Sequence, residues 1–272
     1  MNIEICHDSP IPLEFQWLTP DRLVPLDEFE IAKLPVVFGN RKAELGEFAK
    51  IVKRDWNDTI WFDGHTAKVK GLGAGMKGGL VCVENGAGLH AGAQMTGGVL
   101  MIVGDAGDWL GAEMRGGEIK VRGNAGHNVG SAYRGSRHGM RGGSILVKGN
   151  TGDELGLLMR RGSIVVEGSI GAFAGASMIA GTVVAMKGFG PRAGAGMKRG
   201  TLIAGGPTEV ASGFRHSCDY EPAYLDLLRR EFCPILPRPR TVQCYRGDVL
   251  TGGRGELLVL ESGSLLDRPR RQ

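Results

Sequence analysis

The chain has 272 residues, of which 46 are glycine, 6% are aromatic and 42% are hydrophobic. This hydrophobic content excludes a disordered chain, and the lack of any apolar run of about 18 residues excludes a membrane-spanning helix. The formal net charge of +4, combined with few aromatic residues, does not indicate a nucleic-acid-binding protein.

Residues 1–55 contain no repeat and are interrupted by prolines at positions 10, 12, 20, 25 and 35. They predict an extended capping segment with a short helix near residues 27–33 and a strand and turn at residues 36–40. Residues 60–62 predict the strand of a degenerate first coil. The first ten residues carry acidic residues and a proline where a signal peptide needs basic and then apolar residues, so we expect a cytoplasmic protein.

A repeat with a 19-residue period follows, from about residue 71 to residue 206. Methionines mark it, and six of them are followed directly by a basic or polar residue, whereas Met178 is followed by Ile179. The markers are Met76, Met95, Met114, Met140, Met159, Met178 and Met197. Their intervals are 19, 19, 26, 19, 19 and 19 residues, so seven residues are inserted before Met140, and Tyr133 occupies the expected marker position. A fixed period of this length is typical of a solenoid.

Apolar residues recur at fixed places around each marker. Five and seven places after it stand Val81 and Val83, Leu100 and Ile102, Ile119 and Val121, Ile145 and Val147, Ile164 and Val166, Val183 and Ala185, and Leu202 and Ala204. Four places before it stand Leu72, Ala91, Leu110, Val129, Leu155, Ala174 and Ala193. Alternation with a period of two places such residues on one face of a strand, so we expect both rows to point inward.

Glycine recurs three places after, three places before and seven places before the marker. The first row is Gly79, Gly98, Gly117, Gly143, Gly162, Gly181 and Gly200, and the second is Gly73, Gly92, Gly111, Gly130, Gly156, Gly175 and Gly194. The third is Gly88, Gly107, Gly126, Gly152, Gly171 and Gly190. These rows predict corners, where the backbone adopts positive φ or approaches another segment closely. We expect the row three places before the marker to form a flat outer surface.

A 19-residue unit is too short for a strand–helix–strand unit, which needs about 30 residues or more. It fits one coil of a right-handed parallel β-helix. We therefore predict an all-β protein with an N-terminal segment (1–55), a β-helix of about seven coils (56–206) and a C-terminal extension (207–272) that packs on the coils and contacts partners. The extension should contain a helix at residues 221–232, an extended path at 234–239 and a hairpin or strand at 249–260.

The chain contains no catalytic motif. Its glycine triplets recur in every coil, which argues against a dinucleotide site, and neither a nucleophile elbow nor a paired carboxylate is present. The histidines share no coil position, and we expect His90 and His127 to have satisfied surface roles. The five cysteines show no CxxC spacing and are predicted to be free thiols; a zinc site of His216, Cys218 and Cys233 is the alternative.

The outer surface is the candidate functional region. Six places after each marker lies an outward row with six apolar members out of seven: Cys82, Met101, Lys120, Leu146, Val165, Val184 and Ile203. An exposed apolar stripe implies a cover. That cover is either a partner, with Met101, Leu146, Val165, Val184 and Ile203 as interface residues, or the chain's own terminal segments. If a partner covers the row, Leu146→Asp or Val184→Asp should release the partner and leave the fold intact.

The insertion at residues 133–140 is the second candidate, because functional residues are frequently on loops held by a rigid scaffold. Its Arg134, Arg137 and His138, together with the neighbouring Tyr133 and Arg141, could contact carboxylates of a partner or of an anionic cofactor chain. The alternative is a solvated loop without a binding role.

The segments GAGMKGG, GAQMTGG, GAEMRGG and GSAYRGSRHGMRGG resemble the C subunit of formylmethanofuran dehydrogenase and of the bacterial formyltransferase/hydrolase complex. The coil is also similar to the C-terminal domain of the glutamate synthase large subunit. The resemblance implies a non-catalytic scaffold subunit, with no catalytic, cofactor-binding or metal residue of its own, in a cytoplasmic hetero-oligomer. A methanofuran-type carrier and a metal in the amidohydrolase subunit would then belong to the complex as a whole.

The partners that the resemblance implies are an amidohydrolase-like A subunit, a molybdopterin-enzyme-like B subunit and a formyltransferase D subunit. Together they would transfer formyl between tetrahydromethanopterin and the carrier and release formate. The high Arg-to-Lys ratio favours this bacterial complex over a molybdenum or tungsten formylmethanofuran dehydrogenase, which is the alternative. A self-standing transferase and a free-standing glutamate-synthase-like module are the further alternatives.

Overall fold

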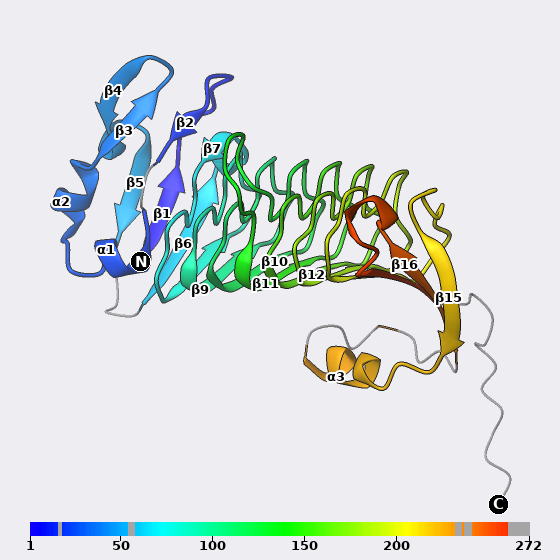
Figure 1. Ribbon diagram of the computed structural model, residues 1–272. Coiled ribbons are helices and arrows are strands. Elements are labelled where there is room, and N and C mark those ends of the chain that lie inside the picture. The colour runs from blue at the N-terminus through cyan, green and yellow to red at the C-terminus, as the bar shows by residue number, and fades with distance from the viewer. Residues whose placement is uncertain (16–17, 54–57, 232–235, 237–240, 261–272) are drawn as a thin grey trace, which may run out of the picture.

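The computed structural model describes residues 1–15, 18–53, 58–231, 236 and 241–260 of the chain (Figure 1). In these residues strands predominate, so the predicted all-β class is confirmed. Thirteen of the described strands form one sheet in the order β15-β16-β17-β14-β13-β12-β11-β10-β9-β8-β6-β1-β5. A smaller sheet of the described N-terminal strands has the order β4-β3-β2-β7.

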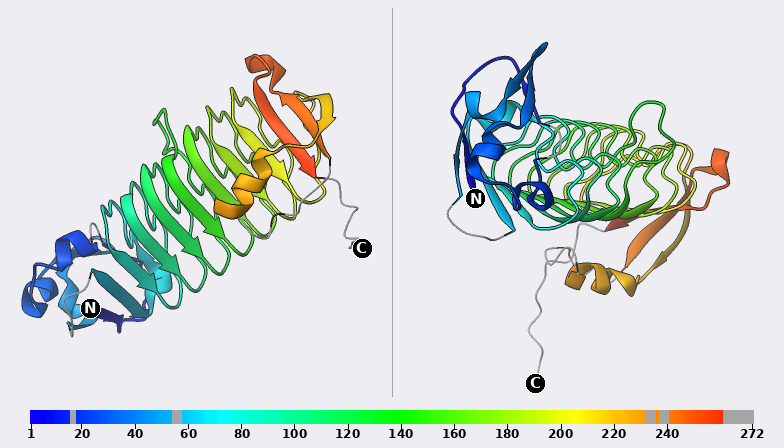
Figure 2. Two further views of the ribbon diagram at one scale, coloured as in Figure 1. Left: turned by 90° about the horizontal axis from the view of Figure 1, so that it is seen from below. Right: turned by 90° about the vertical axis from the view of Figure 1, so that its left-hand side faces the viewer.

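The centre of the large sheet is a parallel ladder that gains one strand with each repeat. Its strands are β6 (Thr59–Gly64), β8 (Leu80–Val83), β9 (Thr96–Ile102), β10 (Gly116–Val121), β11 (Arg141–Val147), β12 (Arg161–Val166), β13 (Thr182–Ala185) and β14 (Thr201–Ala204). Equivalent positions pair: Val81 faces Leu100, and Leu100 faces Ile119. The 19-residue spacing along the chain therefore becomes a straight row in space, and the coils stack along one axis (Figure 2).

A second line of contacts joins the coils away from the strands. Isolated parallel bridges link Ala87 to Ala106, Ala106 to Ala125, and so on through Thr151 and Ile170 to Phe189. At another corner, the N–H of the glycine three places before the marker donates to the preceding coil from Gly92 onward, as from Gly111 to the carbonyl of Ala91 at 2.8 Å. Each coil is thus hydrogen-bonded to its neighbour at several points, and these bonds pair backbone N–H and C=O groups that lie outside the strands.

The interior of the stack consists of the residues that the repeat predicts. All fourteen alternating strand residues and the whole row four places before the marker are buried, and the seven marker methionines have no exposed surface. The flanking Glu118, Lys120 and Arg122 are not buried. The prediction that these apolar rows point inward is therefore confirmed.

The glycine rows serve different purposes. Those three places after and three places before the marker adopt positive φ throughout, as predicted for corners. The row seven places before does not, but a Cβ at Gly107 would lie 2.8 Å from the carbonyl carbon of Gly88 in the preceding coil. The expectation that the row three places before the marker is an outer surface is wrong. Those glycines are buried, and a Cβ at Gly111 would meet Ile145 and Ile119 of the core.

The N-terminal residues close one end of the stack. Strand β1 (Asn2–Ile5) pairs in parallel with β6 and antiparallel with β5 (Ala49–Val52). The remaining elements of this region are β2 (Leu13–Glu14), α1 (Pro20–Leu23), α2 (Glu28–Ala32), β3 (Pro35–Phe38), β4 (Arg41–Glu44), η1 (Leu45–Glu47), η2 (Thr66–Lys68) and β7 (Val69–Lys70). The predicted helix is α2, which begins with a capping box between Asp27 and Glu30, and the predicted strand is β3.

The C-terminal residues close the other end. Strand β17 (Gly255–Leu260) returns to the ladder as the next parallel strand beside β14, and β16 (Val242–Gly247) and β15 (Arg215–Tyr220) follow antiparallel. Helix α3 (Tyr224–Glu231) lies below the strands (Figure 1). It matches the predicted helix at 221–232. The predicted strand at 249–260 begins only at β17, because η3 (Val249–Thr251) precedes it. The predicted extended path at 234–239 lies outside the described residues except for Leu236.

The contact between neighbouring coils can be tested at Gly143. A Cβ there would lie 2.5 Å from the carbonyl oxygen of Gly117, with φ at +86°, whereas Gly135 in the insertion has φ of +84° and no atom within 4 Å of its Cβ position. We expect Gly135→Ala to cost about 1–2 kcal/mol of unfolding free energy from backbone strain alone. Gly143→Ala should cost about 1–3 kcal/mol more, because the coils must move apart. Urea denaturation of both variants measures the difference, and equal losses would contradict close stacking.

Candidate partner-binding site

The insertion is anchored by an aromatic cluster of His90, Trp109 and Tyr133. The ring of Tyr133 stacks on Trp109 with centroids 5.0 Å apart and an interplanar angle of 30°, and Trp109 stacks on His90 at 6.4 Å and 23°. The Tyr133 hydroxyl and Nδ1 of His90 are hydrogen-bonded at 2.9 Å. Tyr133 is therefore a half-buried anchor that holds the insertion against the two preceding coils.

Both titratable members of the aromatic cluster are neutral at pH 7. Burial, assisted by the charge of Glu113, raises the pKa of Tyr133 to about 12. Burial and the nearby Lys70 lower the pKa of His90, and Glu14 and Asp108 only partly oppose them. The cluster is thus an apolar, aromatic surface element rather than an acid–base pair.

The tip of the insertion is exposed and basic. Arg134 and Arg137 are exposed, and the N–H of Ser136 donates to the carbonyl of Tyr133 at 2.9 Å to form the turn. The loop closes where the N–H of Met140 donates to the carbonyl of Gly130 at 2.8 Å. Because the seven extra residues leave and rejoin the coil at this point, β10 and β11 still pair in register. Both arginines are therefore accessible to a partner, and their contact with carboxylates stays a prediction.

His138 and Arg141 lie at the base of the insertion. Nε2 of His138 is 2.9 Å from Nη1 of Arg160, so the histidine contacts the next coil. Arg141 opens β11 beside Arg161 of β12, and its buried Nε has no hydrogen-bond partner within the described part of the chain. The structure thus joins these two residues to a basic edge of the stack rather than to the loop tip.

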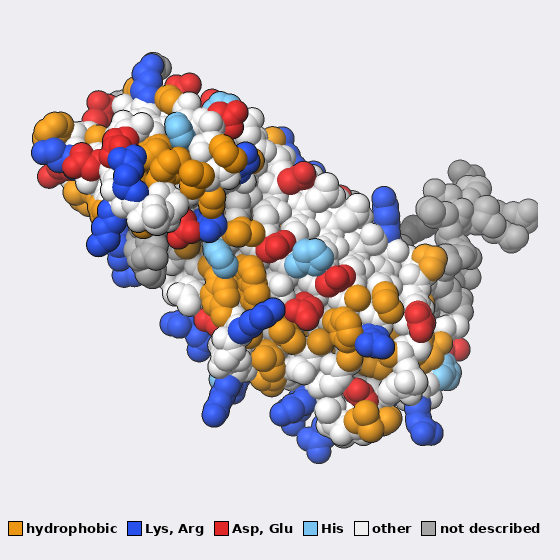
Figure 3. Space-filling model, turned by 90° about the horizontal axis from the view of Figure 1, so that it is seen from above, with side chains coloured by type: hydrophobic (Ala, Val, Ile, Leu, Met, Phe, Trp, Pro, Cys, Tyr) orange, Lys and Arg blue, Asp and Glu red, His pale blue; other side chains and the backbone are white. Residues whose placement is uncertain are grey.

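A cleft of about 310 Å³ adjoins the aromatic cluster. Gly71, Ala74, Gly75 and Ala93 are among its lining residues, together with His90, Tyr133 and Phe15. At its rim Nζ of Lys70 forms an ion pair with Oε1 of Glu14 at 2.5 Å. Figure 3 shows apolar side chains in the middle of the face seen from above, with Lys and Arg side chains projecting along its lower edge.

The outward apolar row is partly covered by the chain itself. Val165, Val184 and Ile203 are buried in a cluster with Leu225, Leu236 and Leu258, and Tyr220, Tyr224 and Leu228 pack against it. Of the two covers predicted for the row, the chain's own C-terminal segment therefore occupies this half. Leu146 lies half-buried at the margin, and Met101 is half-buried outside the cluster. A partner role for the row remains a prediction for these two residues.

The burial of Val184 overturns one expected mutational effect. Val184→Asp was expected to release a partner and leave the fold intact, but the side chain is 1% exposed and contributes to intramolecular packing. A carboxylate there would be buried without a counter-charge, so the substitution acts on the fold.

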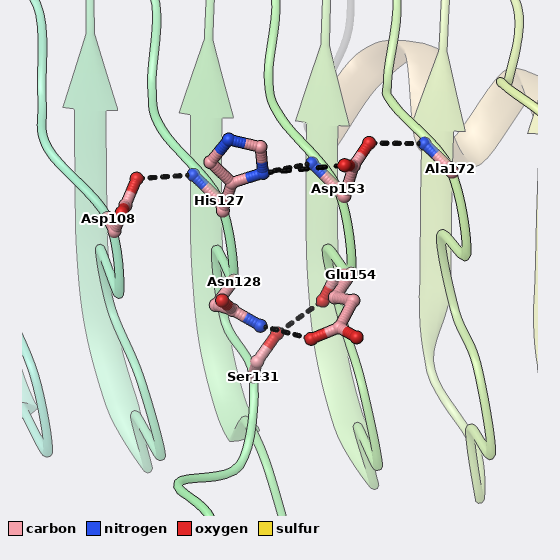
Figure 4. Close-up of polar contacts among 7 residues, drawn as sticks. All are labelled: Asp108, His127, Asn128, Ser131, Asp153, Glu154 and Ala172. Carbon is pink, nitrogen blue, oxygen red and sulfur yellow. Dashed lines mark hydrogen bonds and ion pairs between the residues drawn. The ribbon is translucent and has the colours of Figure 1, made fainter.

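Sequence reasoning missed a polar ladder that links four coils (Figure 4). The N–H of His127 donates to Oδ1 of Asp108 at 2.7 Å, the N–H of Asp153 donates to Nδ1 of His127 at 2.9 Å, and the N–H of Ala172 donates to Oδ1 of Asp153 at 2.7 Å. A parallel ladder runs through Asp105, Asn124 and Asn150. With Tyr133 counted as the marker of its coil, the residues of the first ladder stand six places before the marker and those of the second ladder stand nine places before it. This shared repeat position was the signal from which the sequence could have predicted the ladders.

The polar ladder settles the role of His127. Its backbone N–H donates to Asp108 and its Nδ1 accepts the N–H of Asp153, so the residue links the coils on either side of it and stabilises the stack. Below it, Nδ2 of Asn128 donates to Oε2 of Glu154 at 2.8 Å, and Oγ of Ser131 donates to the carbonyl of Glu154 at 2.5 Å (Figure 4). The predicted satisfied surface role of His127 is confirmed.

Metal-binding geometry is absent from the described residues, where no three His, Cys, Asp or Glu side chains gather. Nε2 of His216 is 2.7 Å from Oδ1 of Asp219, and Cys218 is free and exposed. Cys233, the third member of the alternative zinc site, lies outside the described residues. No helix in the described part of the chain has the length and apolar character needed to cross a membrane.

A solved structure matches the chain over nearly its whole length. It is a chain of the formyltransferase/hydrolase complex (FhcABCD) from Methylorubrum extorquens in complex with methylofuran, with 33% sequence identity and a TM-score of 0.88. The match covers 96% of the present chain and 100% of that one. No protein-family model matches the sequence.

Curated relatives match only part of the chain. The C subunit of molybdenum-containing formylmethanofuran dehydrogenase 1 is 41% identical over 86 residues in Methanothermobacter marburgensis and in Methanothermobacter thermautotrophicus, and 40% identical in Methanothermobacter wolfeii. Each match covers 31% of the present chain and 22% of the relative.

The packing of α3 over the apolar row can be tested with two substitutions to aspartate, one in the row and one on the exposed face of α3. We expect Val184→Asp to cost about 3 kcal/mol or more of unfolding free energy, because it buries an unpaired carboxylate. Leu227→Asp, on the 60% exposed Leu227 of α3, should change it by about 0.5 kcal/mol or less. Urea denaturation and trypsin cleavage at Arg229 and Arg230 report stability and helix release. If Val184→Asp were as harmless as the control, α3 would not cover the row.

The lowered pKa of His90 predicts a pH dependence of stability. The unfolded chain, with a histidine pKa near 6.5, binds the proton more readily than the folded chain. His90 therefore costs no stability above pH 6.5, and stability is lost as the pH falls from there to the folded-state pKa. His90→Asn, which tolerates the positive φ of 64°, should remove this component. Thermal unfolding from pH 7.5 to 5 checks this; equal slopes in wild type and variant would contradict it.

Proposed function

Because this chain belongs to the C-subunit family of formylmethanofuran dehydrogenases and formyltransferase/hydrolase complexes, we propose that it is the non-catalytic scaffold subunit of a formyltransferase/hydrolase complex. The observation that carries the proposal is the match along the whole chain to a component of such a complex, at 33% identity and a TM-score of 0.88. A similarity of this length supports a shared place in the assembly as well as a shared fold.

The proposed partners are an amidohydrolase-like A subunit, a molybdopterin-enzyme-like B subunit and a formyltransferase D subunit, in a cytoplasmic complex. The D subunit would move formyl between tetrahydromethanopterin and a methanofuran-type carrier, and the A subunit would release formate at its metal site. The methylofuran in the matching structure supports a furan carrier at the level of the complex. The present chain would supply surfaces and no reacting group.

The alternative is the C subunit of a molybdenum or tungsten formylmethanofuran dehydrogenase. The 41% identity over 86 residues to two archaeal proteins of that kind favours it. The match is higher in identity but covers only 22% of each relative, so it gives less support than the full-length match. Both assignments share the scaffold role and differ in the chemistry of the partners.

We further propose that the stack of coils is a right-handed parallel β-helix spanning residues 56–206, flanked by the N-terminal segment 1–55 and the C-terminal extension 207–272. Such a rod has two ends and several long faces, which suits a subunit that contacts different partners at the same time. The exposed Arg134 and Arg137, the cleft beside Tyr133 and the half-buried Met101 are the proposed partner contacts on these faces.

The proposal is tested by purifying the tagged chain from its native cells. We expect the A, B and D subunits to co-purify, with formyltransferase and formate-releasing activity in the complex and none in the isolated chain. The double variant Arg134→Glu/Arg137→Glu should weaken assembly by about tenfold, because it reverses the charge at the rim of an interface. The control Lys148→Glu/Lys187→Glu has the same change in charge on another part of the coils. Turnover of a formyl donor by the isolated chain would refute the scaffold function.

A further inference from the structure

A basic groove lies at the C-terminal half of the stack, apart from the insertion tip. It is a cleft of about 630 Å³ lined by Arg160, Arg161, Lys198, Arg199 and Arg254. All five side chains belong to exposed residues. No acidic residue of the described chain is among the lining residues, so this groove concentrates positive charge on a protein whose net charge is only +4.

The repeat explains where these charges come from. The two positions after the marker hold Arg160 and Arg161 in one coil and Lys198 and Arg199 two coils later. The coil between them is the one whose marker, Met178, is followed by Ile179 and Ala180, and both residues line the groove. Since coils are spaced at about 4.8 Å, the two basic walls are roughly 10 Å apart and are separated by an apolar floor.

The cations of the groove are not neutralised within the described residues. None of the five forms an ion pair there, and the polar contact of Arg160 is with the His138 ring, which is neutral or cationic and never an anion. Arg141, one coil earlier at the position equivalent to Arg160, keeps a buried Nε without a partner in the described chain. Five like charges around one cleft repel each other, and an anionic occupant would remove that cost.

We propose that this groove binds an acidic segment of a partner subunit. Carboxylates of the segment contact the Arg160–Arg161 wall and the Lys198–Arg199 wall, and an apolar side chain between them lies on Ile179. A single small anion cannot reach both walls at a separation of roughly 10 Å. A single-stranded nucleic acid would need aromatic side chains for its bases, and none lines the groove within the described residues.

The inference rests on the proposed scaffold function, because the acidic segment belongs to another subunit of the complex. Its test uses the full-length chain without the complex, so that failure of peptide binding is distinguishable from failure of co-purification. The probe is a fluorescein-labelled peptide Gly-Glu-Glu-Leu-Glu-Glu-Gly, and the matched peptide has Ser in place of Leu. Fluorescence anisotropy measures the binding of each.

We expect the Leu peptide to bind more tightly than the Ser peptide and to lose affinity when the salt is raised from about 0.05 to about 0.3 M. Arg160→Glu/Lys198→Glu should weaken binding at least about tenfold, and the control Lys148→Glu/Lys187→Glu should change it by less than about twofold. Ile179→Lys should retain binding of both peptides and abolish the preference for Leu.

Three outcomes would overturn the inference. Equal binding of the Leu and Ser peptides by the wild type would mean that the apolar floor is not used. Equal weakening by the groove variant and the control would indicate attraction to net charge alone. Displacement of the peptide by an equal concentration of citrate, or binding of an oligothymidylate as tight as that of the peptide, would identify a site for small anions or for nucleic acid instead.

Discussion

The hydrogen bonding of each coil to the same position of the next coil is the constraint on which the whole structure depends. It brings equivalent residues into contact all along the stack, so each residue must pack against the residue at the same repeat position in the next coil. Apolar residues satisfy this requirement inside, where Val81, Leu100 and Ile119 form one row. Glycine satisfies it where backbones approach too closely for a Cβ, as at Gly143.

On the outer surface the same constraint aligns the residues at one repeat position, so residues of the same chemical type form a continuous row. Polar residues in register bond to the next coil and become a ladder, as with Asp108, His127 and Asp153. Apolar residues in register become a stripe, and the cluster around Val184 shows that α3 and Leu236 pack against half of it. Basic residues in register repel each other, so a row of them favours binding of an acidic partner. The described residues therefore include polar ladders that are satisfied within the stack, an apolar row that is half-covered and a basic groove that is open.

The interior was predictable from the sequence because burial follows the period, and the period is visible without any alignment. A cover over Val184 was also predictable, but the choice between a partner and a terminal segment was not, because α3 belongs to an extension that lies outside the repeat and has no periodic signal to relate it to a coil position. The outer placement predicted for glycines such as Gly111 failed for a different reason. A residue without a side chain carries no apolar or polar signal, so its direction depends on backbone geometry, and φ of +60° at Gly111 turns the missing Cβ toward Ile119. The role of Tyr133 needed the distances to Trp109 and His90.

Departures from the repeat are the most informative places in such a chain. Stacking alone can account for a residue type that recurs at the same repeat position, so its recurrence does not indicate that it binds a partner. The insertion at 133–140 interrupts the 19-residue spacing, and the pair Ile179–Ala180 keeps the spacing but replaces the basic or polar residue that follows the other markers. The ladder continues undisturbed past each of them. Stacking therefore does not require them. The insertion projects two arginines beyond the coils, and Ile179–Ala180 interrupts a basic row and creates a floor between two charged walls. This apolar floor gives the groove a feature that a partner can distinguish from charge alone.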